Sequence, residues 1–274
     1  MIIFDFMIGI FDSGMGGLSV AREMKKKEEG ISFSYFGDLA RFPWGNKSQN
    51  LIRQYSSEIC DFFIEKGIEE IVIACNTASA LAGDYLRKKY PEIKFYDVVV
   101  PVIEKIQKEA LRKKILKVGV IGTKATIGSD YYLKKIKQIK TPCEIRIYQK
   151  ACPLFAPMVE ENWTENEVAQ RIVKIYLEDL KKEKIDVLVL GCTHYPMLEK
   201  TIAEFLGEGV LIINSAKEVT NAIGKDGNLK KHSGQKVAGF KEQVYYFSDW
   251  TDSYQEVMEN ILGEKIEKRS IKLI

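Results

Sequence analysis

The stretch that decides the fold is residues 68–75 (IEEIVIAC), a short apolar run rich in β-branched residues that ends in a small residue and Cys75. Asn76, Thr77 and a segment with helical spacing of apolar residues follow it. The same pattern returns at residues 185–192 (IDVLVLGC), which end in Cys192 before Thr193 and another helix-like segment. A buried strand that leads directly into a helix is the repeating unit of parallel α/β sheets.

Outward from these two runs, strand-like and helix-like segments alternate along most of the chain. This alternation predicts an α/β protein with doubly wound, mainly parallel sheets. The predicted strands are residues 8–11, 33–36, 71–74, 96–100, 118–121, 144–148, 187–190, 211–213 and 244–247. The polar residues 224–243 predict a long surface loop before the last of these strands.

The two cysteine runs belong to a loose internal repeat. Residues 8–11 (IGIF) pair with 118–121 (VGVI), and residues 97–100 pair with 210–213 in the same order. The members of each pair lie about 110 to 117 residues apart, as expected for two duplicated halves. Two pseudo-symmetric halves can form a binding site in the cleft between them.

Composition places the chain among ordinary globular proteins. It has 274 residues, of which 46% are hydrophobic and 29% charged, so disordered and collagen-like compositions are excluded. The net charge is +3 and the basic residues are scattered, which argues against nucleic acid as a partner. No run approaches the ~20 apolar residues that a membrane span needs, and the opening MIIFDFMIGIF reads as a strand.

The cysteine and histidine counts bear on compartment and metals. Five cysteines without a CxxC pair predict reduced thiols in a cytoplasmic protein. Only two histidines are present, His194 and His232, and neither has metal-ligand spacing to a cysteine, so we expect no metal. A buried cysteine is most often a small hydrophobe, which is the interpretation we favour for Cys60, Cys143 and Cys152.

Cys75 and Cys192 differ from the other cysteines because they share a context. Each follows a predicted strand at the carboxyl edge of its sheet, where ligands bind in open α/β folds. The polar residues after each thiol precede a helix, whose free N–H groups favour a carboxylate. A thiolate on one side of a carbon atom can remove the proton of that carbon, and a thiol on the other side can donate a proton to the opposite face. The result is racemisation. Asp12 and His194 are the residues available to tune the thiols.

Two further loops follow strands and are candidates for ligand contact. The first is DSGMGG at residues 12–17, which matches neither a dinucleotide fingerprint nor a P-loop and could equally be a tight turn. The second contains Pro43, Trp44 and Gly45, which could bring backbone N–H groups to a ligand or form an ordinary turn.

The chain resembles the cofactor-independent glutamate racemases. Six phrases carry the resemblance, in the order and at the spacing of that family: IGIFDSGMGGLSV, YFGDLARFPWG, IVIACNTASA, GVIGTKATIGSDYY, ACPLFAPMVEE and VLGCTHYPML. Aspartate racemases share the two-cysteine plan, but DSGMGG and GCTHYP resemble the glutamate branch. The resemblance implies two α/β domains, residues 1–101 plus 215–274 and residues 102–214. It also implies a homodimer that supplies D-glutamate for peptidoglycan without a cofactor.

The resemblance also implies roles for individual residues. Cys75 and Cys192 would be the acid/base catalysts, with Cys75 facing the α-proton of D-glutamate and Cys192 that of L-glutamate. His194 would assist Cys192, and Glu160 would orient His194. The other implied residues are Asp12 and Ser13 for the amino group, Asn76, Thr77, Thr123 and Thr193 around the substrate, Pro43, Trp44 and Gly45 for the side-chain carboxylate, and Asp38 as an outer partner of Cys75.

Two departures from the family and three alternatives accompany this interpretation. Trp44 stands where the family usually has Tyr, so a larger indole could narrow the mouth of the site, and Asn214 replaces a common Asp. The alternatives are a racemase of another acidic amino acid such as aspartate, a non-catalytic amino-acid-binding protein, and a redox protein in which Cys75 and Cys192 form a disulfide.

Overall fold

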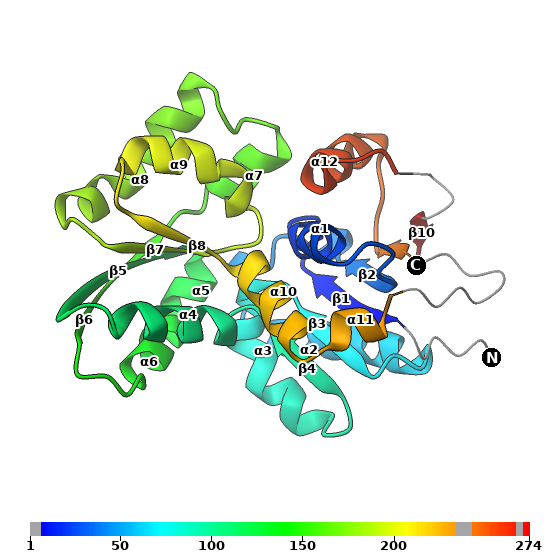
Figure 1. Cartoon of the computed structure of the whole chain (residues 1–274). Coiled ribbons are helices and arrows are strands. Elements are labelled where there is room, and N and C mark those ends of the chain that lie inside the picture. The colour runs from blue at the N-terminus through cyan, green and yellow to red at the C-terminus, as the bar shows by residue number, and fades with distance from the viewer. Residues whose placement is uncertain (1–6, 234–242, 267–270) are drawn as a thin grey trace.

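The computed structural model describes residues 7–233, 243–266 and 271–274, and its strands form two separate parallel sheets (Figure 1). The first sheet contains β1 (Ile8–Asp12), β2 (Phe33–Gly37), β3 (Glu70–Ile73), β4 (Lys94–Asp97), β9 (Gln243–Phe247) and β10 (Ile271–Leu273). The second contains β5 (Ile115–Gly122), β6 (Glu144–Ala151), β7 (Val187–Gly191) and β8 (Leu211–Asn214). The predicted α/β fold with two parallel sheets is thus confirmed.

The two sheets have equivalent strand orders. The first sheet runs β10-β9-β2-β1-β3-β4 and the second β6-β5-β7-β8, so the block β2-β1-β3-β4 has its counterpart in the whole second sheet. In this correspondence β3 matches β7, which are the strands that lead to Cys75 and Cys192. The sequence repeat therefore corresponds to a topological repeat.

Helices cover both faces of each sheet (Figure 1). On the first sheet, α2 (Gln49–Glu65) and α3 (Asn76–Lys89) pack on one face, and α1 (Leu18–Lys27), α10 (Ser215–Lys225) and α12 (Asp252–Leu262) on the other. On the second sheet, α7 (Phe155–Glu160), α8 (Glu167–Lys182) and α9 (Glu199–Leu206) lie opposite α4 (Val100–Ala110) and α6 (Tyr131–Lys137). The short elements are η1 (Leu39–Arg41), η2 (Trp44–Asn46), α5 (Lys124–Gly128), η3 (Tyr195–Leu198) and α11 (Asn228–Lys231).

Alternation along the strands explains this layering. In β7, Val187 and Val189 join the core on the α4 side, whereas Leu188 and Leu190 join the core under α8 and α9. Successive side chains of a strand point to opposite faces, so a strand buried on both sides must be apolar throughout. This is why the strands next to the thiols appear in the sequence as continuous apolar runs.

The structure corrects three predicted elements. The strand predicted over 96–100 is β4 at Lys94–Asp97, because the Asp97 carboxylate accepts the N–H groups of Val99 and Val100, at 2.8 and 2.9 Å, and turns the chain into α4. Strand β10 was not predicted. Within the predicted loop 224–243, α10 extends to Lys225 and α11 follows, while residues 234–242 lie outside the described part of the chain.

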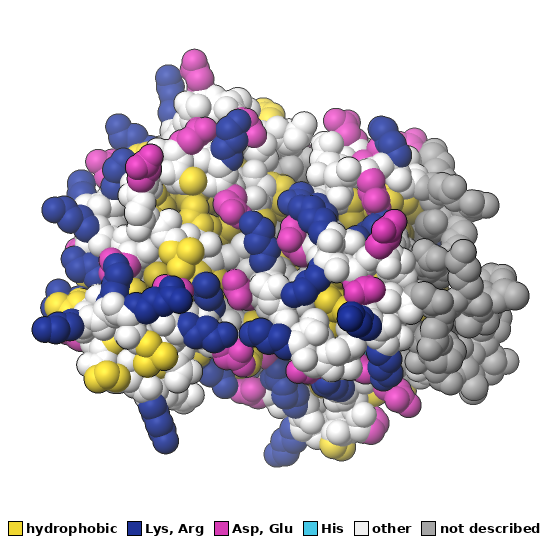
Figure 2. All heavy atoms as spheres, in the orientation of Figure 1, with side chains coloured by type: hydrophobic (Ala, Val, Ile, Leu, Met, Phe, Trp, Pro, Cys, Tyr) yellow, Lys and Arg dark blue, Asp and Glu magenta, His cyan; other side chains and the backbone are white. Residues whose placement is uncertain are grey.

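The distribution of charge on the surface and the length of the helices bear on the partners of the protein. Figure 2 shows Lys and Arg side chains interspersed with Asp and Glu over the visible face, without a single large basic area. Among the described residues, no helix is both long and apolar enough to cross a membrane.

Candidate active site

A cavity of about 130 Å³ lies where residues that follow the strands of the two sheets come together. Its lining includes Cys75, which follows a strand of the first sheet, and Cys192, which follows a strand of the second sheet. The other sequence-predicted residues that line it are Ser13, Pro43, Trp44, Gly45, Asn76, Thr77, Thr123, Thr193 and His194. Segments more than 100 residues apart in the chain therefore contribute to one small site.

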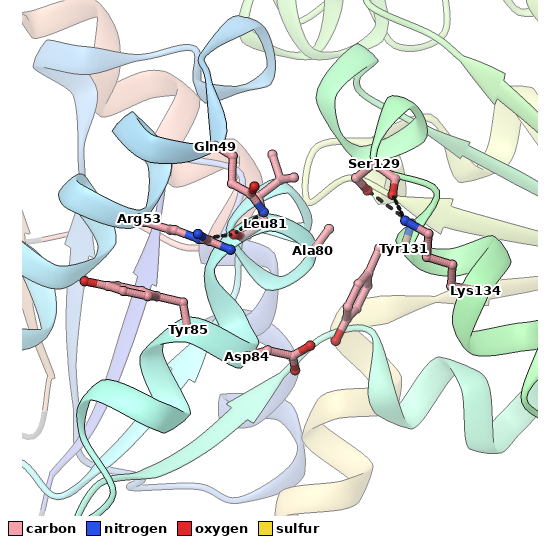
Figure 3. Close-up of a pocket in the computed structure, with 9 residues that line it drawn as sticks. All are labelled: Gln49, Arg53, Ala80, Leu81, Asp84, Tyr85, Ser129, Tyr131 and Lys134. Atoms are coloured by element: carbon pink, nitrogen blue, oxygen red, sulfur yellow. Dashed lines mark hydrogen bonds between the residues drawn. The ribbon is translucent and has the colours of Figure 1, made fainter.

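A second cavity of about 340 Å³ lies between α2 and α3 on one side and α5 and α6 on the other (Figure 3). It contains no cysteine or histidine among its lining residues. Its two cationic side chains donate hydrogen bonds to backbone carbonyls. Arg53 donates to the carbonyl of Leu81 at 3.3 Å, and Lys134 donates to the carbonyl of Ser129 at 3.1 Å. Both predicted thiols and His194 therefore lie at the smaller cavity.

Cys75 is held by the start of α3. It is the N-cap residue, and its sulfur accepts the N–H of Ala78 at 3.5 Å and lies 3.7 Å from the hydroxyl oxygen of Ser13. Burial, reinforced by the negative charge of Asp12, raises the pKa of the Cys75 thiol to about 12, although Ala78 and Ser13 act in the opposite direction. In the ligand-free protein this group is a thiol at neutral pH and so a proton donor.

Cys192 stands beside a positive group instead. Its sulfur is 3.8 Å from Nδ1 of His194, and Nε2 of the same ring is 3.2 Å from a carboxylate oxygen of Glu160 at the end of α7. Burial acts to lower the pKa of His194, but the contacts with Cys192 and Glu160 outweigh it and raise that pKa to about 10. His194 is therefore charged at neutral pH.

Asp12 is fully buried at the end of β1, between the loop of residues 13–17 and Thr193. Its carboxylate accepts the N–H of Gly14 at 3.1 Å and the hydroxyl of Thr193 at 3.3 Å. Burial raises its pKa, while the charge of His194 and these hydrogen bonds lower it. A buried carboxylate with remaining acceptor capacity is suited to an ammonium group.

The loop of residues 12–17 requires glycine at position 16 because its backbone passes very close to Thr193 and His194. A Cβ on Gly16 would lie 2.4 Å from Oγ1 of Thr193 and 2.5 Å from Nδ1 of His194. No side chain larger than hydrogen fits there without displacing these two residues. The structure shows DSGMGG as a tight turn packed directly against the site, and Ser13 of this turn lines the cavity.

Hydroxyl and amide groups join the two sheets next to the cavity. The hydroxyls of Thr77, Thr123 and Thr126 lie within 3.0 to 3.1 Å of one another. The side chain of Asn76 is bound at both ends, by the Tyr132 hydroxyl and by Ser215. Asn76 retains its backbone N–H at the start of α3 and the second N–H of its amide for a ligand.

Asp38 and Trp44 lie together behind the cavity. The buried Asp38 carboxylate accepts the indole N–H of Trp44 at 3.1 Å, the Arg41 Nε–H at 2.7 Å and the Ser248 hydroxyl at 2.8 Å. The indole is fully buried, and its ring centroid lies 5.7 Å from that of Tyr55. Asn214, the other departure, caps α10 through the N–H groups of Ala216 and Lys217.

Several lining residues were not predicted individually. They are Phe42, Asn46, Lys124, Pro153, Ala156 and Pro157. Pro153, Ala156 and Pro157 lie within the quoted phrase ACPLFAPMVEE, but apolar side chains have no chemical signature that marks them as lining a site. Phe42 packs against His194, with ring centroids 6.0 Å apart.

Two findings concern metals and disulfides in the described residues. No group of three or more His, Cys, Asp or Glu side chains there could hold a metal ion. All five cysteines are free and buried.

Comparison with known proteins defines the class. The family model for Asp/Glu/Hydantoin racemase matches residues 30–223, which is more than half of the chain. The chain therefore belongs to the Asp/Glu/hydantoin racemase family and is a racemase, an isomerase, built on an α/β fold.

Within this family, its relatives point to one branch. The chain is 41% identical over 263 residues to glutamate racemase of Aquifex aeolicus, covering 96% of each protein. It is 45% identical over 230 residues to glutamate racemase of a Sulfurihydrogenibium species, covering 81% of this chain and 86% of that protein. The crystal structure of Francisella tularensis glutamate racemase in complex with D-glutamate superimposes with a TM-score of 0.87, 29% identity and coverage of 98% and 97%.

Proposed function

We propose that this protein interconverts L- and D-glutamate by a two-base proton transfer between Cys75 and Cys192. The observation that carries the proposal is that two thiols, one from each sheet, line a single small cavity while a negative group lies near one and a positive group near the other. The glutamate branch is supported by the names of the relatives and by the D-glutamate complex of the Francisella protein.

In the proposed reaction one thiol acts as base and the other as acid. Starting from L-glutamate, the Cys192 thiolate removes the α-proton and the Cys75 thiol donates its proton to the opposite face of the carbanion. Starting from D-glutamate, the roles are reversed. Asp12 and Ser13 bind the ammonium group, and Asn76, Thr77 and Thr193 hold the α-carboxylate. The ammonium beside Asp12 opposes the charge that raises the pKa of Cys75, so substrate binding favours the proton transfers.

The remaining residues have supporting roles in the proposal. His194 assists Cys192 and is oriented by Glu160, and the backbone at Pro43, Trp44 and Gly45 receives the side-chain carboxylate next to Thr123. Asp38 accepts the indole N–H of Trp44 and so holds this side chain in place. Asp38 thereby supports the site from outside the cavity. We also propose the domain division 1–101 plus 215–274 and 102–214, in agreement with the membership of the two sheets.

Proton NMR in deuterated water tests the reaction and the substrate together. With L-glutamate, the α-proton signal and the optical rotation should both disappear, without added cofactor and after treatment with a chelator. L-Aspartate should react much more slowly. Faster loss with aspartate would make the protein an aspartate racemase, and binding without proton exchange would make it an amino-acid-binding protein.

A partial reaction tests the division of labour between the thiols. An amino acid with a leaving group on the β-carbon needs only removal of the α-proton to eliminate. Cys192→Ser should therefore still eliminate from the D-analogue and Cys75→Ser from the L-analogue, while neither racemises glutamate, because a hydroxyl is far less acidic than a thiol. A variant that handles both enantiomers equally would contradict the two-base mechanism.

The cellular part of the proposal is a cytoplasmic homodimer that supplies D-glutamate for peptidoglycan and hence for cell shape. Expression of the protein should restore growth of a bacterial strain that requires external D-glutamate, and Cys75→Ser should fail to do so. Light scattering of the purified protein should give twice the chain mass of 31.3 kDa.

A further inference from the structure

The side chain of Asn76 forms a buried bridge between the two sheets. The hydroxyl of Tyr132, on α6 beside the second sheet, donates to Oδ1 of Asn76 at 2.7 Å. The Nδ2 group of Asn76 donates in turn to the hydroxyl oxygen of Ser215 at 3.4 Å. Tyr132, Asn76 and Ser215 are 0%, 2% and 1% exposed, so water does not compete for these hydrogen bonds.

The bridge continues to the strand that leads to the second thiol. The Ser215 hydroxyl donates to the backbone carbonyl of Leu190 at 3.3 Å, and Leu190 lies in β7 two residues before Cys192. At the other end, Asn76 follows Cys75 directly and is the first residue of α3. A continuous series of side-chain hydrogen bonds therefore connects the neighbour of one thiol to the strand of the other.

We propose that Tyr132 and Ser215 are positioning residues, which act through Asn76 to fix the spacing between the two thiols. The inference rests on the proposed two-thiol reaction. Neither Tyr132 nor Ser215 is among the residues that line the cavity, and the hydroxyl of each already donates a hydrogen bond, to Asn76 and to Leu190 respectively. Both thiols must be within reach of one α-carbon, and a displacement of about 1 Å in such an arrangement can cost roughly 10²-fold in rate.

Each partner restrains a different end of the amide. Without the Tyr132 hydroxyl, Oδ1 of Asn76 loses its short hydrogen bond and remains buried, which favours rotation of the amide or a shift of the α3 start. Without the Ser215 hydroxyl, the link to β7 is lost, but the hydrogen bond removed is longer. The bridge therefore predicts a larger effect at Tyr132 than at Ser215.

The test is the kinetics of Tyr132→Phe, with kcat expressed per folded molecule from circular dichroism. We expect kcat to fall about tenfold or more in both directions, with KM within about threefold of the wild-type value, because substrate contacts remain while proton transfer is misaligned. Ser215→Ala should show the same kcat-selective loss to a smaller extent, and it serves as the second variant if Tyr132→Phe does not fold. The double variant should lose less than the product of the two single losses, since both act through Asn76.

Tyr131→Phe is the matched control. Tyr131 is the preceding residue of α6, is also buried, and lines the other cavity near Asp84 (Figure 3). It should keep the wild-type kcat and KM. Unchanged kcat in Tyr132→Phe and Ser215→Ala, or an equal loss in Tyr131→Phe, would overturn the inference while the wild-type protein still racemises glutamate. A wild-type protein without racemisation would instead remove the proposed function.

Discussion

At the scale of single residues, the two thiols have surroundings of opposite charge. Burial, reinforced by the charge of Asp12, raises the pKa of Cys75 to about 12, so this group holds its proton at neutral pH. His194 keeps its own proton until about pH 10, next to Cys192. Groups whose surroundings differ in this way are typical of acid and base pairs in active sites.

Glu160→Gln should change the pH dependence of the reaction. Glu160 raises the pKa of His194, so its replacement lets that pKa fall from about 10 toward 6.5. His194 then loses its positive charge at a lower pH, and the alkaline limb of kcat/KM should move down by about one pH unit. The measurement is a pH profile from 6 to 10.5. Glu161→Gln, which changes the exposed neighbouring residue, should leave the profile in place; an unmoved limb in Glu160→Gln would contradict the role of the ion pair.

Asp12→Asn should have opposite effects on thiol reactivity and on turnover. Removal of the negative charge lowers the pKa of Cys75, so iodoacetamide should alkylate Cys75 faster at a fixed pH. Turnover should fall by on the order of 10²-fold, more than KM rises, because the group that binds the ammonium and sets thiol protonation is lost. Mass spectrometry of the Cys75 peptide reports alkylation. Asp84→Asn, at an exposed position of α3, is the control, and a slower alkylation in Asp12→Asn would refute the electrostatic argument.

At the scale of elements, the site depends on how closely a loop and two strand ends approach one another. The loop after β1 contacts the turn after β7 so tightly that Gly16 touches Thr193 and His194. Helix α3 begins at the residue after Cys75, which places its free N–H groups at the cavity. Catalytic geometry is therefore set by where elements start and end.

Gly16→Ala should damage the site more than the fold. The added methyl group would lie 2.4 Å from Oγ1 of Thr193, so Thr193 and His194 must move. We expect kcat to fall at least tenfold, with a loss of stability of about 1 to 3 kcal/mol from overpacking. Gly128→Ala is the matched control, because a Cβ there meets nothing within 4 Å. The measurements are kcat and the thermal unfolding temperature of both variants. Equal kcat of the two variants would show that the close contact at Gly16 is unimportant.

The sequence predicted most elements because buried parallel strands are continuous apolar runs. It failed where a local side chain decided the boundary, as at Asp97, whose carboxylate turns the chain after β4. It also missed β10, a strand of only three residues at the sheet edge with two of them exposed. Such a segment has neither the length nor the apolar content of a predicted strand.

The site was predictable in part. The repeated strand, cysteine and polar pattern singled out Cys75 and Cys192, and the structure brings both to one cavity. Tyr132 and Ser215 could not be found in this way, since a buried Tyr and a Ser at a helix start are common in any core or cap. Their importance depends on distances between segments that are far apart in the chain.

At the scale of the whole molecule, one apolar core runs through both sheets. Val72 of the first sheet and Val120 of the second belong to the same cluster, joined by residues of α4 and α10 such as Val102 and Val219. The two halves therefore cannot separate widely without exposing apolar surface. A ligand between them should stabilise the entire molecule.

D-Glutamate should accordingly raise the thermal unfolding temperature. At about 100 times its Kd a ligand stabilises by about 2.7 kcal/mol, which corresponds to a shift of roughly 5 to 10 °C for a chain of this size. D-Aspartate at the same concentration should give a smaller shift, and potassium chloride at equal ionic strength should give none. Differential scanning calorimetry makes the comparison, and a larger shift with aspartate would reverse the substrate preference.

The position of β9 has a consequence for biosynthesis. The second sheet is made of one continuous segment, from Ile115 to Asn214, and can assemble as soon as that segment has left the ribosome. The first sheet must wait, because β2 pairs with β9, which is made about 200 residues later. Until then the apolar strand FSYFG has an open edge, which is a hazard for aggregation. The nascent chain thus completes its later half before its earlier one.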